Sequence, residues 1–379
     1  MIHLSIPSER HAQLQAFGRF GGGQVSWEAN SFAQLLLGWF ALAGRKALPW
    51  QVNPTPYRVW VSEVMLQQTQ VATVIPYYER FMTHFPDVRS LASAPTDEVL
   101  HLWTGLGYYA RARNLQACAQ VLVARHGGEF PRDVEDMMEL PGIGRSTAGA
   151  ILALSGGQRV PILDGNAKRV LARVFGIAGD PTSKAVLSAL WAQADLCTPD
   201  ENVAAYTQAI MDLGATVCIR HNPGCMLCPM GAGCVAALEG RQGELPGRKP
   251  KRIRPSREAT LLIAETGCGG SAAVLVERRP STGLWGGLWS PPQFASEQDA
   301  LAWCLQEFGE AMQPQSLPCI DHAFTHFDLR LNPLRVRCEA RSTVHEGGDR
   351  LWYQLDAPPR IGLPQPIRRL LEQLRADDA

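Results

Sequence analysis

Two carboxylates, Glu63 and Asp164, lie in sequence surroundings that would give them different chemistry. Glu63 stands in YRVWVSEVMLQQ, where a helix would desolvate part of the carboxyl, raise its pKa and suit it to general-acid catalysis. Asp164 follows the apolar run VPIL and precedes NAKRV, so it can cap a helix while facing the space between elements. Such a pair matches glycosidic cleavage, in which one carboxyl protonates the leaving group and the other stabilises positive charge on the sugar. On local sequence alone, an exposed acid and a plain helix cap stay open for the two residues.

Four of the ten cysteines form a cluster with the spacing C-x6-C-x2-C-x5-C, made by Cys218, Cys225, Cys228 and Cys234. Four thiolates this close suit either a tetrahedral zinc or a [4Fe–4S] cluster. Zinc ribbons usually contain two separate C-x2-C pairs, whereas this stretch has one, so the spacing favours the iron–sulfur cluster. The other cysteines are scattered singly and are expected to be small buried thiols and not a disulfide framework.

A glycine-containing turn lies between two helical patterns, in the stretch LPGIGRST at 140–147. Gly142 and Gly144 permit positive φ and the close approach of another backbone. The amides that follow, from Arg145 and Ser146 on, open a helix and present N–H groups at its positive dipole end. Such a hairpin can bind a phosphate without regard to base sequence, although a plain turn between helices remains an alternative.

Polar and aromatic side chains near these motifs are candidates for contact with nucleic acid. Gln67, Gln68 and Gln70 follow Glu63 on the same predicted helix, and the stretch GLGYYARARNL carries Tyr108 beside two arginines, Arg111 and Arg113. These residues form either a solvated face or a polar wedge against unstacked bases.

The elements that must position these residues change in kind along the 379-residue chain. Residues 1–30 are rich in Gly, Ser and Gln, and we assign no role to this N-terminal extension. Residues 31–246 predict a helical domain, because apolar residues recur at three- and four-residue spacing. Residues 247–257, which are rich in Lys, Arg and Pro, predict a basic linker. Residues 258–379 predict a separate α+β domain.

Composition narrows the class of protein. Lys+Arg and Asp+Glu both number 36, so only a local basic stripe is available for nucleic acid. No run approaches the ~18 uncharged apolar residues of a membrane-spanning helix. The N-terminus lacks the apolar core of a secretory signal, so we expect a cytoplasmic protein.

Taken together, SEVMLQQTQV, LPGIGRSTAGA, LDGNAKRV and the four cysteines resemble the adenine DNA glycosylases of the MutY type, from about Ser31 to the C-terminus. The resemblance implies a mainly α, two-lobed helix-hairpin-helix glycosylase domain with a [4Fe–4S] cluster loop, followed by an α+β MutT-like (Nudix-like) domain. It also implies a monofunctional enzyme that flips and excises adenine mispaired with 8-oxoguanine or guanine. Its partner would be double-stranded DNA containing such mispairs, bound by a monomer associated with the nucleoid.

The resemblance also implies roles for individual residues. Glu63 matches the general acid that protonates adenine N7, and Asp164 matches the carboxylate that stabilises the oxocarbenium-like sugar. Tyr108 and Asn166 match residues that help to order that site, and Gln67 matches the intercalating helix. The hairpin residues expected to contact DNA are Gly142, Gly144, Arg145 and Ser146.

The C-terminal domain resembles the MutT-like domain that recognises 8-oxoguanine in this family, through RPSTGLWGGLWSPP and AFTHFDLRL. The family's usual Phe-Ser-His is Phe324-Thr325-His326 here, so we expect Thr325 and His326 to contact the lesion. An ordinary strand with alternating burial is the other interpretation of this stretch. The helix at 296–309 lacks the adjacent Glu pair that binds metal in nucleotide hydrolases of this fold, so we expect no diphosphate hydrolysis.

Two other functions stay open on the sequence. An endonuclease III-like glycosylase/lyase would need a Lys amine after the hairpin to form a Schiff base, and Ser146 stands there. A non-catalytic iron–sulfur DNA-binding module would use the hairpin, cluster and linker alone, and the two carboxylates argue against it.

Overall fold

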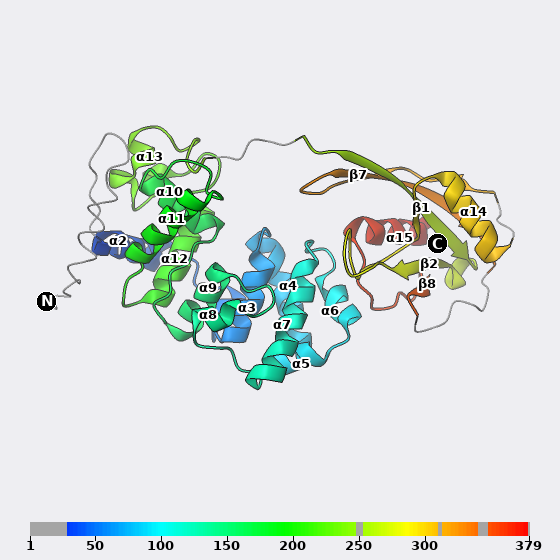
Figure 1. Cartoon of the computed structure of the whole chain (residues 1–379), viewed down its shortest axis with the longest axis horizontal. Coiled ribbons are helices and arrows are strands. Elements are labelled where there is room, and N and C mark those ends of the chain that lie inside the picture. The colour runs from blue at the N-terminus through cyan, green and yellow to red at the C-terminus, as the bar shows by residue number, and fades with distance from the viewer. Residues whose placement is uncertain (1–28, 248–252, 310–312, 340–347, 378–379) are drawn as a thin grey trace. The chain divides into compact units, whose positions relative to one another are not determined.

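The protein is described by a computed structural model over residues 29–247, 253–309, 313–339 and 348–377. These residues form two compact units (Figure 1). We call the first the helical unit; it contains the described residues up to 89 and those from 117 to 247. The second, the mixed unit, contains residues 90–116 together with the described residues from 253 onward.

The helical unit confirms the predicted helical pattern. Its helices are α2 (Ala29–Ala43), η1 (Pro49–Gln51), α3 (Pro56–Leu66), α4 (Val71–His84), α8 (Val134–Met138), α9 (Arg145–Gly156), α10 (Gly165–Val174), α11 (Lys184–Cys197), α12 (Val203–Thr216), η2 (Cys225–Leu227), η3 (Gly231–Gly233) and α13 (Val235–Leu238). Two further helices, α5 (Val88–Ser93) and α7 (Ala110–His126), have residues in both units.

Helix α3 begins and ends for identifiable local reasons. The Thr55 hydroxyl accepts from the Arg58 amide at 3.2 Å, and Pro56 fits the first helical position. The predicted continuation of this helix through the glutamines is wrong, because Gln67 is its C-cap and Gln68 has φ of +57°. Gln67 therefore lies in the turn between α3 and α4 and not on the helix that carries Glu63.

The core of the helical unit brings together α2, α10 and α12. Phe32, Leu36, Val170 and Leu213 are fully buried in it. Helix α10 approaches α12 closely at Gly214, where a Cβ would lie 2.5 Å from the Cβ of Asn166. The glycine is therefore needed for this helix pair to pack, and the packing fixes the start of α10.

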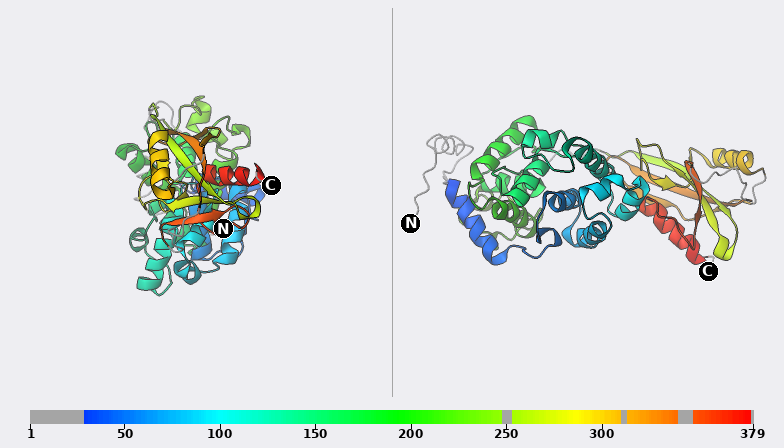
Figure 2. Two further views of the ribbon diagram at one scale, coloured as in Figure 1. Left: turned by 90° about the vertical axis from the view of Figure 1, so that its right-hand side faces the viewer. Right: turned by 90° about the horizontal axis from the view of Figure 1, so that it is seen from below.

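The described residues of the mixed unit form one sheet and three α-helices that lie wholly within the unit, α6 (Thr96–Trp103), α14 (Glu297–Phe308) and α15 (Gln365–Asp377). Its other elements are β1 (Ser256–Thr266), η4 (Gly269–Ser271), β2 (Ala273–Arg278), β3 (Trp289–Ser290), β4 (Gln293–Phe294), β5 (Gln315–Ser316), β6 (Ile320–Ala323), β7 (Asp328–Arg337) and β8 (Arg350–Gln354). The long strands and the two C-terminal helices confirm the predicted α+β domain, and α14 and α15 flank the sheet (Figure 2).

The sheet has the order β3-β2-β1-β7-β5, with β1 and β7 parallel. Strand β6 pairs with β7 as an antiparallel hairpin from Ile320↔Leu331 to Ala323↔Asp328. The α14 residues Ala300, Cys304 and Phe308 pack on the inner face of β1. Because β7 belongs both to this hairpin and to the long β1–β7 pair, the hairpin is a direct extension of the sheet.

The start of the C-terminal domain differs from the sequence-based expectation. Strand β1 begins at Ser256, inside the stretch predicted as the basic linker, because Ser256 pairs with Asp328 of β7. Residues 248–252 of that linker, and 1–28 of the N-terminal extension, lie outside the described residues. Among the described helices, none has the length and apolarity to cross a membrane.

Candidate active site

Helix α3 places Glu63 in a largely apolar setting. Its neighbours Ser62 and Val64 are buried, and Glu63 itself is only partly accessible. Burial, and to a smaller extent the negative charge of Asp164, raises the pKa of Glu63 to about 8. The predicted desolvated carboxyl is therefore present, and at neutral pH it holds a proton that it can donate.

Asp164 is the N-cap of α10. Its Oδ1 accepts from the Ala167 amide at 2.7 Å, and its Oδ2 accepts from Asn166 Nδ2 at 3.1 Å. Asp164 thus caps α10 and at the same time has a fixed side-chain orientation, because each carboxylate oxygen accepts a hydrogen bond. The structure brings Asn166 beside Asp164, as the sequence pattern suggested.

A cavity of about 230 Å³ lies against the face of α3 that carries Ser62, one residue before Glu63. This volume is below the roughly 300–1,000 Å³ of pockets for drug-sized ligands, so it suits a smaller molecule. Its walls come from α2 to η1, α3, α9 and α12, which are distant in sequence, and include Trp50, Gln51, Val59, Ser62, Leu154 and Gln208. Sequence analysis missed these residues because no local motif joins them.

The two glutamine side chains in the cavity wall are oriented by hydrogen bonds to other residues of the unit. Gln51 Oε1 accepts from the Leu48 amide at 3.0 Å, and Gln51 Nε2 donates to the Arg45 carbonyl at 2.9 Å. Gln208 Nε2 donates to Asp212 Oδ1 at 2.9 Å, and Asp212 is fully buried. Arg45 Nη2 pairs with the same carboxylate at 2.5 Å. These contacts leave a rigid wall of apolar rings and oriented amides.

The turn at 140–147 joins α8 to α9. Gly142 has φ of +77°, whereas Gly144 has an ordinary extended φ and is the N-cap of α9. Only the first glycine therefore uses the left-handed region. The Arg145 guanidinium lies 4.1 Å from the Trp191 ring centroid, and Ser146 Oγ accepts from the Leu163 amide at 3.0 Å. The hydroxyl thus connects the start of α9 to the residue before Asp164.

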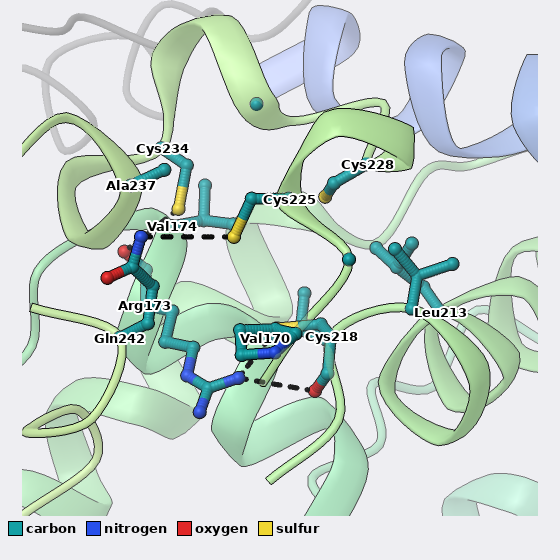
Figure 3. A pocket seen from close by; sticks show the side chains of 14 residues that line it. Val170, Arg173, Val174, Leu213, Cys218, Cys225, Cys228, Cys234, Ala237 and Gln242 are labelled. Carbon is teal, nitrogen blue, oxygen red and sulfur yellow. Dashed lines mark hydrogen bonds between the residues drawn. The ribbon is translucent and has the colours of Figure 1, made fainter. Parts of the chain in front are cut away.

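The four clustered cysteines line one common cavity (Figure 3). Cys218 follows α12, Cys225 begins η2, Cys228 is the C-cap of η2, and Cys234 precedes α13. Burial first, and the neighbouring thiols of Cys218, Cys234 and Cys225 as well, raise the pKa of Cys228. Within the described ranges, no group of three or more His, Cys, Asp or Glu has the geometry of a preformed metal site. Four thiols around an apolar space are a donor set that fits a thiolate-bound metal ion or cluster.

Two arginines of α10 brace the cysteine loop, and sequence analysis missed both. Arg173 is buried and donates to the carbonyl oxygens of Ile219, Arg220 and Leu245 at 2.7, 3.1 and 2.9 Å. Arg169 Nε donates to the Cys218 carbonyl at 2.7 Å, and its Nη2 donates to Asn166 Oδ1 at 2.8 Å. Their four-residue spacing in NAKRVLARV is the signal that places them on one face of the helix.

Tyr108 belongs to the mixed unit, whereas Glu63 and Asp164 belong to the helical unit. It is 52% exposed and has φ of +49°, which is uncommon for a residue with a Cβ. The Arg111 guanidinium lies 5.7 Å from its ring centroid and donates to the carbonyls of Leu106 and Gly107. The loop therefore presents an aromatic side chain to its surroundings.

Thr325 and His326 form the tip of the β6–β7 hairpin, and both are exposed. The Phe324 amide donates to the Phe327 carbonyl at 2.8 Å and closes the turn. The rings of these two residues stack with centroids 4.8 Å apart. A continuous strand through Phe324 to Phe327 is therefore wrong, and the two polar side chains are held at a turn.

Comparison with known proteins gives matches to both parts of the chain. Residues 61–194 match the HhH-GPD superfamily of base excision DNA repair proteins, and residues 266–373 match the NUDIX domain. An adenine DNA glycosylase of Buchnera aphidicola is 38% identical over 345 residues, which cover 91% of this chain and 97% of that protein. The chain belongs to the adenine DNA glycosylase family.

Other members of the family and one solved structure agree with this assignment. The mouse adenine DNA glycosylase is 38% identical, with 80% of this chain and 70% of the mouse protein covered. A thermostable thymine-DNA glycosylase has a TM-score of 0.51 and 26% identity over 56% of this chain and 97% of its own. The predicted helix-hairpin-helix glycosylase domain and Nudix-like domain are thereby confirmed, and the family assignment favours an adenine glycosylase over the two alternatives.

Proposed function

We propose that this protein is a monofunctional DNA glycosylase that removes adenine mispaired with 8-oxoguanine or guanine in double-stranded DNA. The observation that carries the proposal is the pairing of unequal carboxyls in the helical unit. Glu63, whose pKa burial raises to about 8, holds a proton at neutral pH. Asp164 is held by hydrogen bonds from Ala167 and Asn166 in its acceptor role. One group can therefore give a proton while the other balances positive charge.

The reaction steps follow from a protonated Glu63 and an Asp164 that accepts hydrogen bonds. Glu63 donates its proton to adenine N7 as the bond between the sugar C1′ and adenine N9 breaks, so that the base leaves neutral. The electron pair of that bond stays with the base, and positive charge develops on the sugar. Asp164 stabilises this charge, and Asn166 keeps the carboxylate oriented. A water molecule then adds to C1′ and releases a proton.

The base needs a place outside the DNA stack, and the cavity beside α3 offers one. Trp50 supplies an aromatic surface, and the Gln208 amide supplies hydrogen bonding at the wall. The α9 N-terminus, with its amides from Arg145 onward, would hold a phosphate of the same strand. Gln67, in the turn after α3, would contact the gap left by the base.

The mixed unit would contact the base opposite adenine. 8-Oxoguanine differs from guanine by a hydrogen on N7 and an oxygen on C8, so its recognition needs a hydrogen-bonding group at that edge. Thr325 presents a hydroxyl at the hairpin tip, and His326 stands beside it. Tyr108 would stack on a base or sugar nearby.

Cys218, Cys225, Cys228 and Cys234 would hold a [4Fe–4S] cluster. When bound, it would supply a covalent cross-link that stabilises the fold of residues 218–234. Arg173 and Arg169 fix this loop to α10, so its order bears on the position of Asp164. We further propose that the protein acts as a monomer on chromosomal DNA in the cytoplasm.

A base-release assay tests the proposal. Single-turnover adenine release should be fastest from A:8-oxoG duplexes, slower from A:G and negligible from A:T. The DNA strand should stay intact until it is heated in base, because Ser146 cannot form an imine. Glu63→Gln should bind the duplex but release no adenine. Adenine release by Glu63→Gln at the wild-type rate would contradict the proposal.

A further inference from the structure

One hydrogen bond joins two parts of the mixed unit that are far apart in sequence, helix α7, which directly follows the loop at 104–109, and the loop at 280–288. Arg113, in the first turn of α7, donates from Nη1 to the carbonyl oxygen of Gly286 at 2.5 Å. Its Cδ also packs against the next residue, since a Cβ on Gly287 would lie 3.6 Å from it. The arginine therefore contacts the loop after β2 through both its charged end and its stem.

The first of the two loops, residues 104–109, carries the exposed Tyr108. The Arg111 guanidinium stabilises this loop by donating to the carbonyls of Leu106 and Gly107. The Tyr109 hydroxyl donates to the Leu363 carbonyl at 2.9 Å, and the Leu363 amide donates to Thr104 Oγ1 at 3.4 Å. The two ends of the loop are thus attached to one residue of the C-terminal segment.

The second loop, residues 280–288, supports the hairpin that carries Thr325 and His326. The Trp285 ring centroid lies 5.9 Å from that of His322 and 5.7 Å from that of Phe324, next to the turn of the hairpin. The backbone of Trp285 has φ of +54°. The next residue is Gly286, where a Cβ would lie 2.4 Å from the Ser281 carbonyl. This loop is therefore compact as well as in contact with the hairpin.

The Arg113 side chain binds the residue after Trp285, and the Arg113 amide donates to the carbonyl of Tyr109, the residue after Tyr108, at 3.2 Å. Arg113 thus contacts the neighbours of two positions of backbone strain. A non-glycine residue with positive φ persists only where its surroundings determine its conformation. A second contact supports the same junction, because Arg278 donates to both carboxylate oxygens of Asp97 at 3.2 and 2.8 Å. Residues 90–116 are accordingly one compact body with the C-terminal domain.

We propose that Arg113 is a positioning residue that holds the Tyr108 loop and the Thr325–His326 hairpin as one rigid recognition surface for the strand opposite the excised adenine. Selectivity for a lesion that differs by two atoms needs contacts placed within a fraction of an ångström. Two loops that moved independently would accept guanine and 8-oxoguanine more equally. The inference rests on the proposed lesion preference, and it adds the residue that fixes the geometry.

The test compares full-length wild type with Arg113→Met, Thr325→Ala and the double variant. Met keeps the stem packing and removes the donor to Gly286. The A:8-oxoG to A:G ratio of single-turnover rates should fall about three- to tenfold in Arg113→Met. The loss in the double variant should be smaller than the product of the two single losses, because both act on one surface. Arg113→Lys, which keeps a donor, should restore part of the ratio.

Arg375→Met is the matched control, since it removes an exposed ion pair with Asp356 in the same unit and should leave the ratio unchanged. Hydrogen exchange of 104–109 and 320–328 should rise together in Arg113→Met and not in the control. An unchanged ratio, multiplicative losses, or faster exchange in only one loop would overturn the inference. If Arg113→Met does not fold, Trp285→Phe is measured by the same criteria. If the wild-type protein released adenine equally fast from A:8-oxoG and A:G, the proposed function would be refuted. The hydrogen-exchange data would still show whether Arg113 holds the two segments together.

Discussion

Arg169 and Cys218 are joined by a hydrogen bond of 2.7 Å from the guanidinium Nε to the carbonyl oxygen. The same guanidinium donates to Asn166 Oδ1, and Asn166 donates to Asp164. The carboxylate proposed to balance the sugar charge is therefore two side chains away from the first residue of the cysteine loop.

Arg169→Met should slow adenine release about 10- to 100-fold, because hydrogen bonds from a charged donor are worth roughly 1.5–3 kcal/mol each. Asn166 would lose its orienting partner while Glu63 stays in place. Single-turnover rates and iron content, measured on the same preparation, check this expectation. Lys168→Met, at the neighbouring position of α10, is the control. A normal rate in Arg169→Met with a full complement of iron would contradict it.

The pH dependence of the reaction should report Glu63. Its pKa is raised to about 8, and the protonated form is the donor. Adenine release should therefore be insensitive to pH below about 7 and should fall as pH rises through 8. Single-turnover rates between about pH 4 and pH 9.5 test this, because that range covers both the raised pKa of Glu63 and the ordinary carboxyl pKa. A profile that falls through the ordinary carboxyl range near 4–5 would contradict the general-acid role.

Stability should change with pH in the same direction. The pKa of Glu63 is higher in the folded protein than in the unfolded chain, so the folded state binds the extra proton. The stability from this group is complete below the unfolded pKa and is lost as pH rises through 8. Glu63→Gln should gain stability relative to wild type between pH 6 and pH 9, as measured by urea unfolding. No relative gain would mean that the carboxyl is solvated.

Several functional features were predictable because their signal is local. Glu63 is surrounded by apolar residues within four positions, and the four cysteines lie in one short stretch. Asp164 precedes a helix, and its capping role follows from that position alone. The alternation and length of the apolar runs similarly identified β1, β2, β7 and β8.

Features that depend on distant parts of the chain were not predictable. Gln67 was misplaced because a run of helix-forming glutamines hides the left-handed backbone of Gln68. The cavity wall combines Trp50 with Gln208, and the mixed unit joins residues 90–116 to the C-terminal domain. Periodicity describes which face of an element is buried, but it does not show which element covers that face.

Gly214→Ala should destabilise the protein by about 1–3 kcal/mol, because the added methyl would lie 2.5 Å from the Asn166 Cβ and force α12 away from α10. Adenine release should fall as well, since Asn166 would move relative to Asp164. Gly38→Ala is the control, with nothing within 4 Å of its added Cβ. Thermal unfolding and single-turnover rates of both variants give the comparison. Equal behaviour of the two would show that α10 tolerates the displacement.

Removal of one cluster thiol should release the iron and weaken DNA binding. The purified protein should be brown and contain about four irons, and Cys228→Ser should lose iron and weaken DNA binding. Cys319→Ser, at an exposed single cysteine, should keep both. Iron analysis and the absorbance of the thiolate-to-iron charge-transfer band provide the measurement. Stoichiometric zinc in place of iron would contradict the cluster assignment.

Base selection should depend on how Asp212 orients Gln208. A carboxylate paired with Arg45 only accepts hydrogen bonds, so it fixes the Gln208 NH2 on its own side at 2.9 Å. The Gln208 carbonyl oxygen is thereby directed away from Asp212, at the wall of the cavity. An acceptor there matches the 6-amino group of adenine and opposes the 6-oxo group of hypoxanthine.

Asp212→Asn should therefore lower the preference for adenine over hypoxanthine about tenfold, the loss expected when one oriented hydrogen bond is no longer enforced. The new amide can donate to the Gln208 oxygen, so Gln208 can turn its NH2 toward the cavity and accept a 6-oxo purine. Single-turnover release of the two bases opposite 8-oxoguanine measures the ratio. Glu265→Gln is the matched control, because it also neutralises a buried carboxylate that pairs with an arginine, at 2.6 Å from Arg335, but it lies in the mixed unit. A folded Asp212→Asn protein with the wild-type ratio would show that Gln208 is oriented by something other than this carboxylate.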